Sequence, residues 1–326
     1  MSSVAIQSTS QYQAGALAIL FASLLWGTTG TAASFAHQVS PLAIGAFAMG
    51  LGGVIQAMLS WRSIRHQFHQ ILLFKLALAI SSIALALYPL AFYTSMKLSG
   101  VAVGTVISIA SAPFFTVLIE CLFSKGKHVS AQWWVSFAFG LVGITMLVIA
   151  KSGGAVESDQ DSYLFGIALG LIAGLSYAIY SWVAKRMIDG GIKSQAALGS
   201  IFAGGALLLL PSLAFTGENL FTGVTNASVS VYMAIVPMCL GYLAYGYGLR
   251  HVDVSSANLL TLFEPVVAAV LAVWIVGEKI AISGWIGVGL IGVCLILQTL
   301  DKDTNKPKQV TGFPSEHGSL INGIIS

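Results

Sequence analysis

The chain has 326 residues, of which 56% are apolar and only 8% are charged, and its mean hydropathy is +0.87. Because soluble domains carry about 25% charged residues, this composition excludes an ordinary soluble protein and indicates an integral membrane protein. The net charge of +3 is small and dispersed, so nothing in it favours a nucleic-acid partner. Cys121, Cys239 and Cys294 each lie alone in an apolar run, so we expect no disulfide, no metal site and no cofactor.

Ten apolar runs follow one another along the chain, and each can cross the hydrocarbon core of a bilayer as a helix of about 20 residues. They cover residues 14–36, 41–61, 71–95, 100–123, 130–150, 163–184, 195–216, 229–249, 254–276 and 280–299. We therefore predict an all-α integral membrane protein with ten transmembrane helices. A short N-terminal tail (1–13) precedes them, and the polar composition of 300–326 predicts a disordered tail after them.

Lys and Arg are distributed unevenly over the loops, and this distribution sets the orientation of a membrane protein because basic loops stay cytoplasmic. With the N-terminus inside, the inner segments hold twelve basic residues and the outer segments hold three. The inner ones are Arg62, Arg65, Lys75, Lys125, Lys127, Lys185, Arg186, Lys193, Arg250, Lys302, Lys306 and Lys308, and the outer ones are Lys97, Lys151 and Lys279. An even number of spans returns the chain to its starting side, so we predict that both termini are cytoplasmic and that the linker over 151–162 is extracytoplasmic.

The two halves of the chain resemble each other in sequence. The segment PFFTVLIECLFSKGKHVSAQWW (113–134) aligns with PVVAAVLAVWIVGEKIAISGWI (265–286). The halves, 14–150 and 163–299, each contain five runs, and an odd number makes two copies enter the membrane in opposite senses. We therefore predict two inverted five-helix repeats, a construction of secondary transporters that expose one central site alternately to each side.

Four of the prolines inside the apolar runs lie in matching places of the two halves. Pro89 and Pro237 lie in the third and eighth runs, and Pro113 and Pro265 lie in the fourth and ninth. Proline removes a backbone donor and crowds the carbonyl four residues before it, so each of them predicts a helix break. Paired breaks at membrane depth indicate a transporter's binding site, because the freed carbonyls need polar partners or a wet cavity.

Polar side chains spaced by three residues precede the prolines of the fourth and ninth runs. They are Thr105, Ser108 and Ser111 in the first half, and Asn258, Thr261 and Glu264 in the second. This spacing keeps side chains on one helix face, so we expect each half to present a polar stripe that binds substrate. The alternative is that these groups only join helices, since Ser and Thr often bond across helices or to their own preceding turn.

Aromatic residues form a second pattern in the first, third, sixth and eighth runs. They can line a substrate pocket or pack as core. Together with a threonine of the first run, the candidate pocket residues are Trp26, Thr29, Tyr88, Tyr177, Tyr180 and Tyr242. We expect the substrate to stack on these rings while the polar stripes bond its polar groups.

Glu264 is the one carboxyl near the middle of the ninth run, TLFEPVVAAVLAVWIVGEK, and it directly precedes Pro265. An acid at this depth cannot reach the interface, and intramembrane acids usually face a cavity and carry function. Three roles are open. Protonated Glu264 can donate a hydrogen bond to carbonyls freed by Pro265, it can be the acid of proton coupling, or it can pair with a substrate amine.

Two motifs resemble the EamA-type transporters of the drug/metabolite transporter superfamily. One is the dipeptide WG at Trp26, and the other is the block EPVVAAVLAVWIVGEK with Glu264, Pro265, Gly277 and Glu278. The resemblance extends over most of the chain, about 14–299. The first half departs from the pattern, since Ser111 and Ala112 precede Pro113 and SKGK stands where GEK is expected.

This resemblance implies a multi-pass carrier of the plasma membrane, which is the cytoplasmic (inner) membrane in a bacterium. It implies transport of amino acids or other small metabolites, often outward. It also implies a central cavity lined mainly by spans 1, 3, 4, 6, 8 and 9, which are the spans that carry the prolines, polar stripes and aromatic residues described above.

Other classes of membrane protein fit the sequence less well. It has no histidine deep in a run, no HExxH motif and no GxxxxGK[ST] motif, so we expect neither an enzyme nor a primary pump. We predict a secondary transporter for small metabolites, with amino acids as the first candidates, export as the direction and proton coupling as an option. The alternatives are an uncoupled facilitator, a drug or toxic-compound efflux carrier, and a membrane scaffold without transport; the oligomeric state stays open.

Overall fold

The computed structural model describes residues 9–124, 129–151, 160–277 and 279–300, and within these ranges it contains helices but no strands. Ten helical segments are long and apolar enough to cross a membrane. They are Ser10–Ser34, Pro41–His66, Lys75–Ser99, Val103–Phe123, Ala131–Ala150, Gln160–Asp189, Ser194–Thr216, Gly223–Gly248, Val254–Val276 and Ile282–Thr299. The all-α architecture and the ten spans are thus confirmed. Most of the expected tails and of the expected linker lies outside the described residues.

Three of the ten spans are divided into shorter pieces. In the first half the helices are α1 (Thr9–Gly27), α2 (Thr29–Ser34), α3 (Pro41–His66), α4 (Phe68–Leu72), α5 (Lys75–Ser99), α6 (Val101–Phe123) and α7 (Ala131–Lys151). In the second half they are α8 (Gln160–Asp189), α9 (Ser194–Thr216), α10 (Gly223–Met233), η1 (Ala234–Gly241), α11 (Tyr242–Gly248), α12 (Val254–Leu260), α13 (Phe263–Leu271), η2 (Ala272–Val276) and α14 (Ile282–Thr299). Here η1 and η2 are stretches of wider π-helix. Span 1 therefore comprises α1 and α2, span 8 comprises α10, η1 and α11, and span 9 comprises α12, α13 and η2.

The third and sixth spans differ from the predicted runs in ways that move particular residues into or out of a helix. The third span begins only at Lys75, because the preceding residues form the separate short helix α4. The sixth span extends beyond its predicted end at 184, so that Lys185 lies inside α8 and not in a loop. Lys, Arg and Met are good helix formers, and α8 ends just before Gly191, whose φ of +88° favours glycine.

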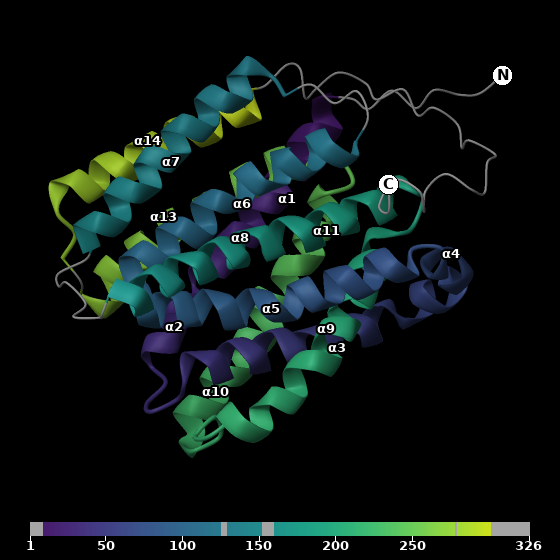
Figure 1. The fold of residues 1–326 in the computed structure, drawn as a ribbon, viewed down its shortest axis with the longest axis horizontal. Coiled ribbons are helices and arrows are strands. Elements are labelled where there is room, and N and C mark those ends of the chain that lie inside the picture. The colour runs from purple at the N-terminus through teal and green to yellow at the C-terminus, as the bar shows by residue number, and fades with distance from the viewer. Residues whose placement is uncertain (1–8, 125–128, 152–159, 278, 301–326) are drawn as a thin grey trace.

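The helices form two central groups between two flanking pairs (Figure 1). We call α5, α6 and α8 the α8 group, because both α5 and α6 pack against α8. We call α1, η1, α11, α12 and α13 the α11 group, in which α1 packs against all the others. The pair α3 and α9 flanks one edge, and the pair α7 and α14 flanks the opposite edge.

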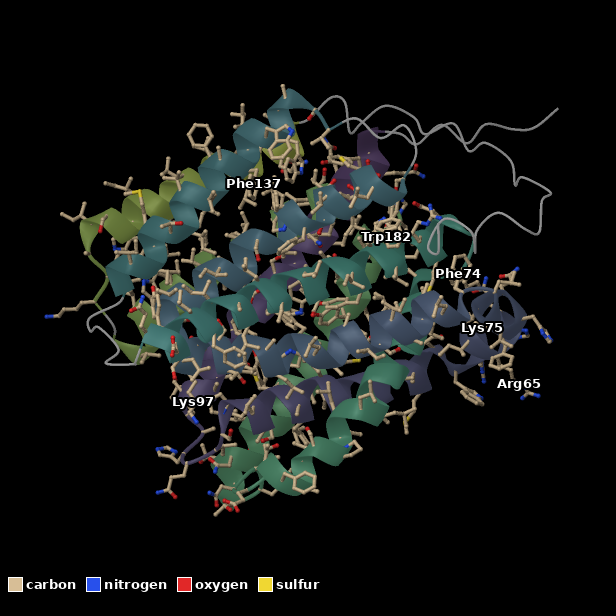
Figure 2. The ribbon with its side chains drawn as sticks, viewed as in Figure 1. Arg65, Phe74, Lys75, Lys97, Phe137 and Trp182 are labelled. Atoms are coloured by element: carbon tan, nitrogen blue, oxygen red, sulfur yellow. The ribbon has the colours of Figure 1, made fainter. Side chains whose placement is uncertain are left out.

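The two ends of the bundle differ in their charge. Figure 2 shows Arg65 and Lys75 at one end and Lys97 at the other. We call the first the basic end; α3, α8 and α11 end there and α5, α9 and α12 begin there. The other is the Lys97 end.

The prolines act differently in the two halves. α5 continues through Pro89 and α6 continues through Pro113, so the expected breaks do not occur there. In the second half, η1 widens around Pro237, and a junction between α12 and α13 precedes Pro265. A proline removes one backbone hydrogen bond but does not by itself end a membrane helix, because neighbouring groups can satisfy the freed carbonyl. The two helices that change at a proline, η1 and α13, are therefore both in the α11 group.

Candidate functional site

The junction in span 9 places Glu264 at the start of α13. Pro265 has no N–H, so it cannot bond to the carbonyl of Thr261, four residues earlier. That carbonyl instead accepts the backbone N–H of Glu264, at an N to O distance of 3.0 Å. The Thr261 carbonyl is thus satisfied without the Glu264 side chain. The structural role that was open for Glu264, donation to a carbonyl freed by Pro265, is therefore not needed at Thr261.

The Glu264 carboxyl faces tyrosines of both helix groups. It lies within electrostatic range of Tyr88 and Tyr93 on α5 and of Tyr242 on α11. Its side chain is partly exposed although it lies within the span. Among the described residues we find no hydrogen bond or ion pair that engages this carboxyl. The described part of the fold therefore provides no fixed partner for this carboxyl.

The widened stretch of span 8 provides two carbonyls to neighbouring helices. Trp26 of α1 donates its indole N–H to the Pro237 carbonyl at 2.9 Å, and Gln56 of α3 donates its Nε2 to the Met238 carbonyl at 2.8 Å. Wider π-helix turns misalign backbone groups and often mark functional sites. Trp26 thus binds the π-helical stretch of span 8 through its indole N–H. Sequence reasoning missed Gln56, although an amide in an otherwise apolar run was a detectable signal.

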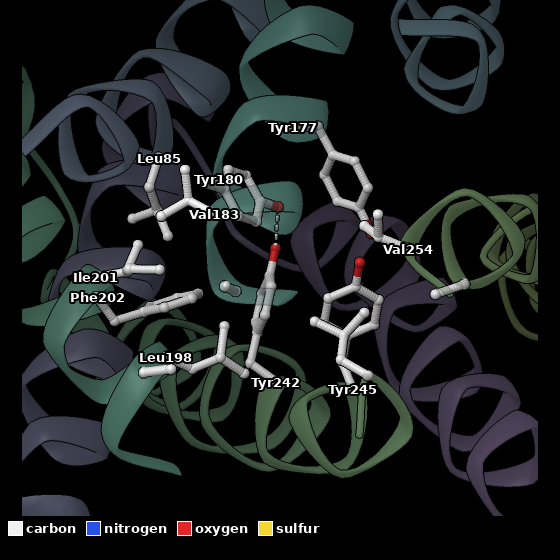
Figure 3. Packing of buried hydrophobic residues seen from close by; sticks show 14 of the residues in the cluster. Leu85, Tyr177, Tyr180, Val183, Leu198, Ile201, Phe202, Tyr242, Tyr245 and Val254 are labelled. Carbon is white, nitrogen blue, oxygen red and sulfur yellow. Dashed lines mark hydrogen bonds between the residues drawn. The ribbon is translucent and has the colours of Figure 1, made fainter. Parts of the chain in front are cut away.

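The predicted aromatic residues do gather in one place. The Trp26 ring centroid lies 4.7 Å from that of Tyr242, and the Tyr88 centroid lies 5.7 Å from that of Tyr177. The hydroxyls of Tyr180 and Tyr242 bond to each other at 2.8 Å, in the buried cluster that Figure 3 shows. These two rings are fully packed, whereas Tyr88 stays partly exposed.

Asn258, a predicted binding residue, is occupied by helix contacts. Its Oδ1 accepts the hydroxyl of Tyr245 at 2.5 Å, and its Nδ2 donates to Thr116 Oγ1 at 2.8 Å. The Thr261 hydroxyl donates to the Asn258 carbonyl at 2.7 Å. These bonds join α11 and α12 to α6. This arrangement fits the alternative reading of the stripe, in which polar groups join helices, and sequence reasoning assigned no role to Tyr245 or Thr116.

The first-half stripe lies at a helix contact as well. The Ser111 hydroxyl donates to the Ser108 carbonyl at 3.4 Å, and a Cβ added to Gly174 of α8 would clash with both groups. Ser108 is buried and Thr105 is partly exposed. Both serines therefore lie in the close contact between α6 and α8.

Thr29 lies at the start of α2, the short helix that completes span 1 and packs against α13 and η2. It is partly exposed. Its neighbour Thr28 accepts the hydroxyl of Tyr232 at 2.8 Å, which ties α10 to the junction between α1 and α2. Thr29 thus borders the helix of Glu264, while Thr28 makes the structural contact.

The α8 group and the α11 group are in closer contact along α12 than along α13. α12 packs against α6 and α8 of the opposite group, whereas α13 packs mainly against α1, α2 and α14. All seven residues of α12 are buried, but in α13 only Pro265 and Ala269 are. The groups therefore meet toward the basic end, and Glu264 lies where they begin to separate toward the Lys97 end.

Among the described residues, three side-chain hydrogen bonds connect the two groups, and they lie on the basic-end side of Glu264. Two are the Tyr180–Tyr242 and Thr116–Asn258 bonds described above. The third is made by Lys185 of α8, whose Nζ donates to the Leu249 carbonyl at 2.7 Å and lies 3.1 Å from Asp189 Oδ1. Lys185 is only 6% exposed. A buried lysine that binds the carbonyls at a helix C-terminus is favourable, because its charge complements the helix dipole.

Ten membrane spans, broken central helices and a carboxyl where two helix groups separate are features of a membrane transporter. Known proteins support this class. The model of the EamA-like transporter family matches residues 13–149 and again residues 164–299. The chain therefore belongs to the EamA-like transporter family.

Several relatives are named as transporters. The uncharacterized transporter YwfM of Bacillus subtilis is 30% identical over 86% of this chain and 92% of its own. The uncharacterized inner membrane transporter YedA of Escherichia coli is 31% identical over 60% of each chain. A probable terminal-alkyne amino-acid exporter of Streptantibioticus cattleyicolor is 29% identical over 58% of this chain and 61% of its own.

A solved crystal structure shares the fold. Its TM-score is 0.72 over 88% of this chain and 96% of its own, at 19% identity. The family and the ten spans make the chain a multi-pass membrane protein of the bacterial inner membrane. The names of the family and of these relatives indicate transport and not an enzymatic reaction.

Proposed function

We propose that the chain is a secondary transporter that exports small metabolites by alternating access, with amino acids as the first candidates for substrate. The observation that carries this proposal is the Glu264 carboxyl, which lies at a helix junction and has no hydrogen-bond or ion-pair partner among the described residues. An acid at this depth that the fold does not use is best explained by a ligand or an ion. The name of the Streptantibioticus cattleyicolor relative, a probable terminal-alkyne amino-acid exporter, supports the substrate class.

We further propose that the basic end is cytoplasmic, so that both termini are inside and the two halves form inverted repeats. Twelve of the fifteen Lys and Arg residues of the sequence then fall on the inner side, as expected from the positive-inside rule. In this orientation the Tyr180, Asn258 and Lys185 bonds close the cytoplasmic side. The structure then corresponds to an outward-facing form of the carrier.

In this proposal, one carboxylate binds two competing cations. A proton from outside can neutralise Glu264, and the ammonium group of a substrate from inside can pair with it, but the two cannot bind together. Competition for one site couples their movements in opposite directions, which is the requirement for export driven by a proton gradient. The partly exposed ring of Tyr88 lies within electrostatic range of Glu264 and suits the apolar part of an amino acid.

The test is transport by the purified protein in proteoliposomes, with a panel of amino acids and small metabolites and with or without an imposed pH gradient. Saturable transport that a pH gradient accelerates supports proton-coupled exchange. Saturable transport that does not respond to the gradient indicates an uncoupled facilitator, and it returns Glu264 to a substrate-binding role. Transport of hydrophobic cationic drugs but not amino acids would identify the efflux alternative, and no transport at all would contradict the proposal.

A further inference from the structure

A second site lies away from Glu264, on the outer face of the flanking helices α3 and α9. A cavity of about 710 Å³ runs between them. Its floor is formed by small residues such as Ala57 and Ala203, and its rims are formed by large ones, with Met58 and Trp61 on α3 and Leu207 on α9. The three rim side chains are 71%, 62% and 77% exposed. Both helices are membrane spans, so this apolar groove opens toward lipid acyl chains.

The apolar face of α3 continues directly into basic residues. Val54, Met58, Trp61 and Arg65 are spaced by four, three and four residues, which places them on one face of the helix. Arg65 lies one turn beyond Trp61, about 6 Å further along the axis. Arg62, the neighbour of Trp61, is exposed, and so is Arg65. The groove therefore ends at two guanidinium groups at the basic end.

The start of α9 brings a third cation to the same end. Gln67, just after α3, accepts the backbone N–H of Lys193 at 2.9 Å and donates to the Gly191 carbonyl at 3.0 Å. These bonds fix the beginning of α9 beside the end of α3. Lys193 is exposed. An apolar groove that ends among Arg62, Arg65 and Lys193 matches the shape and charge of one class of molecule, an acidic lipid.

We propose that this groove binds one anionic phospholipid, with an acyl chain between α3 and α9 and the phosphate at Arg62, Arg65 and Lys193. Guanidinium groups bind phosphate oxygens in pairs. An indole ring such as that of Trp61 is favourable at the level of the headgroups. Each basic residue near a membrane surface strengthens binding of anionic lipid roughly fivefold. The site is separate from the transport pathway and does not depend on the proposed function.

The experiment uses Trp61 as the reporter. The full-length protein is reconstituted with phosphatidylcholine vesicles that contain increasing fractions of brominated phosphatidylglycerol or of brominated phosphatidylcholine, both of which quench nearby tryptophan. The difference between the wild-type protein and Trp61→Phe isolates the Trp61 signal. We expect brominated phosphatidylglycerol to quench Trp61 at a severalfold lower fraction than brominated phosphatidylcholine. Equal quenching by the two lipids would mean that only unselective bilayer lipid covers the groove, and it would overturn the proposal.

Variants then separate the headgroup site from the groove. Arg65→Gln lowers the preference for the anionic lipid roughly fivefold, and Arg62→Gln has the same effect. Lys97→Gln, at the opposite end of the bundle, is the matched control and leaves the preference unchanged. Ala203→Phe fills the floor of the groove and lowers the preference without changing the charge. A preference that survives Arg62→Gln and Arg65→Gln together contradicts the assigned headgroup site.

Discussion

Two pieces of span 9, α12 and α13, differ in their burial and in their contacts. α12, toward the basic end, is entirely buried and joins the two helix groups through Asn258. α13, on the other side of the junction, packs mainly against α1, α2 and α14 and leaves Glu264 partly exposed. The junction therefore separates a fully buried part of span 9 from a less buried part that carries Glu264.

Hydrogen bonds near the Lys97 end have a different pattern from those at the basic end. Asn226 of α10 accepts the His37 N–H and donates to the carbonyls of His37 and Asn219, and Tyr232 of α10 bonds to Thr28. These contacts tie loops and helix ends to span 1, and they do not connect the α8 group with the α11 group. The basic end, in contrast, has bonds between the groups. If the groups rock against each other, the bonds at the basic end must break, while those near the Lys97 end can persist.

The largest expected effect comes from Glu264→Gln. Loss of the charge removes the partner for an ammonium group, and a hydrogen bond to a charged group contributes about 1.5–3 kcal/mol, or roughly 10–100-fold in substrate affinity. It also removes the response of transport to a pH gradient. The measurement is the concentration dependence of transport in proteoliposomes at two gradients. Glu218→Gln, exposed outside the spans, is the control, and unchanged transport in Glu264→Gln would eliminate the proposed exchange.

The second largest effect is expected from Lys185→Met, which tests whether the bonds of Lys185 keep the basic end closed. This change removes the bond to the Leu249 carbonyl and the ion pair with Asp189. We expect the equilibrium to shift about 10–100-fold toward a form open at the basic end, because a charged hydrogen bond is lost. The measurement is the rate at which a cysteine introduced by Ser181→Cys, at a fully buried position of α8, reacts with a thiol reagent.

The control for this shift is Lys193→Met, because Lys193 is a basic residue of the same end with an exposed side chain. Cys121 is the exposed native cysteine, so both variants are best made with Cys121→Ser. We expect the reaction rate to rise in Lys185→Met and to stay low in Lys193→Met. A rate that does not change in Lys185→Met would show that Lys185 contributes to packing but does not hold the basic end closed.

A smaller effect is expected from the Tyr180–Tyr242 pair. Tyr180→Phe or Tyr242→Phe alone leaves one buried hydroxyl without its partner, which costs about 1–3 kcal/mol of folding free energy. The double variant removes both hydroxyls, so its cost is smaller than the sum of the single costs. Thermal unfolding of the four proteins in detergent gives this coupling. Tyr247→Phe, on an exposed tyrosine, changes the melting temperature little, and strictly additive single effects would contradict the observed bond.

The sequence predicts the spans of this fold well because the signal for a membrane helix is local. Apolar length alone locates all ten spans, and the prolines of the second half accompany a π-helical stretch at Pro237 and a helix junction before Pro265. The prolines of the first half mislead, since Pro89 and Pro113 lie in continuous helices. Whether a helix widens at a proline depends on donors from other helices, such as Trp26 and Gln56 at η1. Such donors cannot be found from the proline's own neighbours in sequence.

The candidate site was predictable only in part, for the same reason. Glu264 and the aromatic cluster follow from unusual residue types at membrane depth. The bonds of Asn258 do not, because they require Tyr245 and Thr116 from two distant spans. The sequence predicts a loop at Lys185 because this residue follows the apolar run. In the structure Lys185 lies within the bundle because α8 extends to Asp189. Contacts between spans thus decide which polar residues are structural and which stay accessible.

The smallest expected effect concerns pH and His251, in the loop between α11 and α12 at the basic end. Burial lowers the pKa of His251, and the positive charges of Arg250 and Lys185 lower it further. The unfolded chain takes up a proton near the ordinary pKa of about 6.5, while the folded chain resists protonation. Stability is therefore unaffected above that pH and falls as the pH drops below it. His251→Gln should flatten this fall in the melting temperature, whereas His69→Gln, on the exposed helix α4, should keep it. If the melting temperature of His251→Gln falls with pH as steeply as that of the wild-type protein, His251 does not cause the loss of stability. Burial at the basic end would then not disfavour protonation of this side chain.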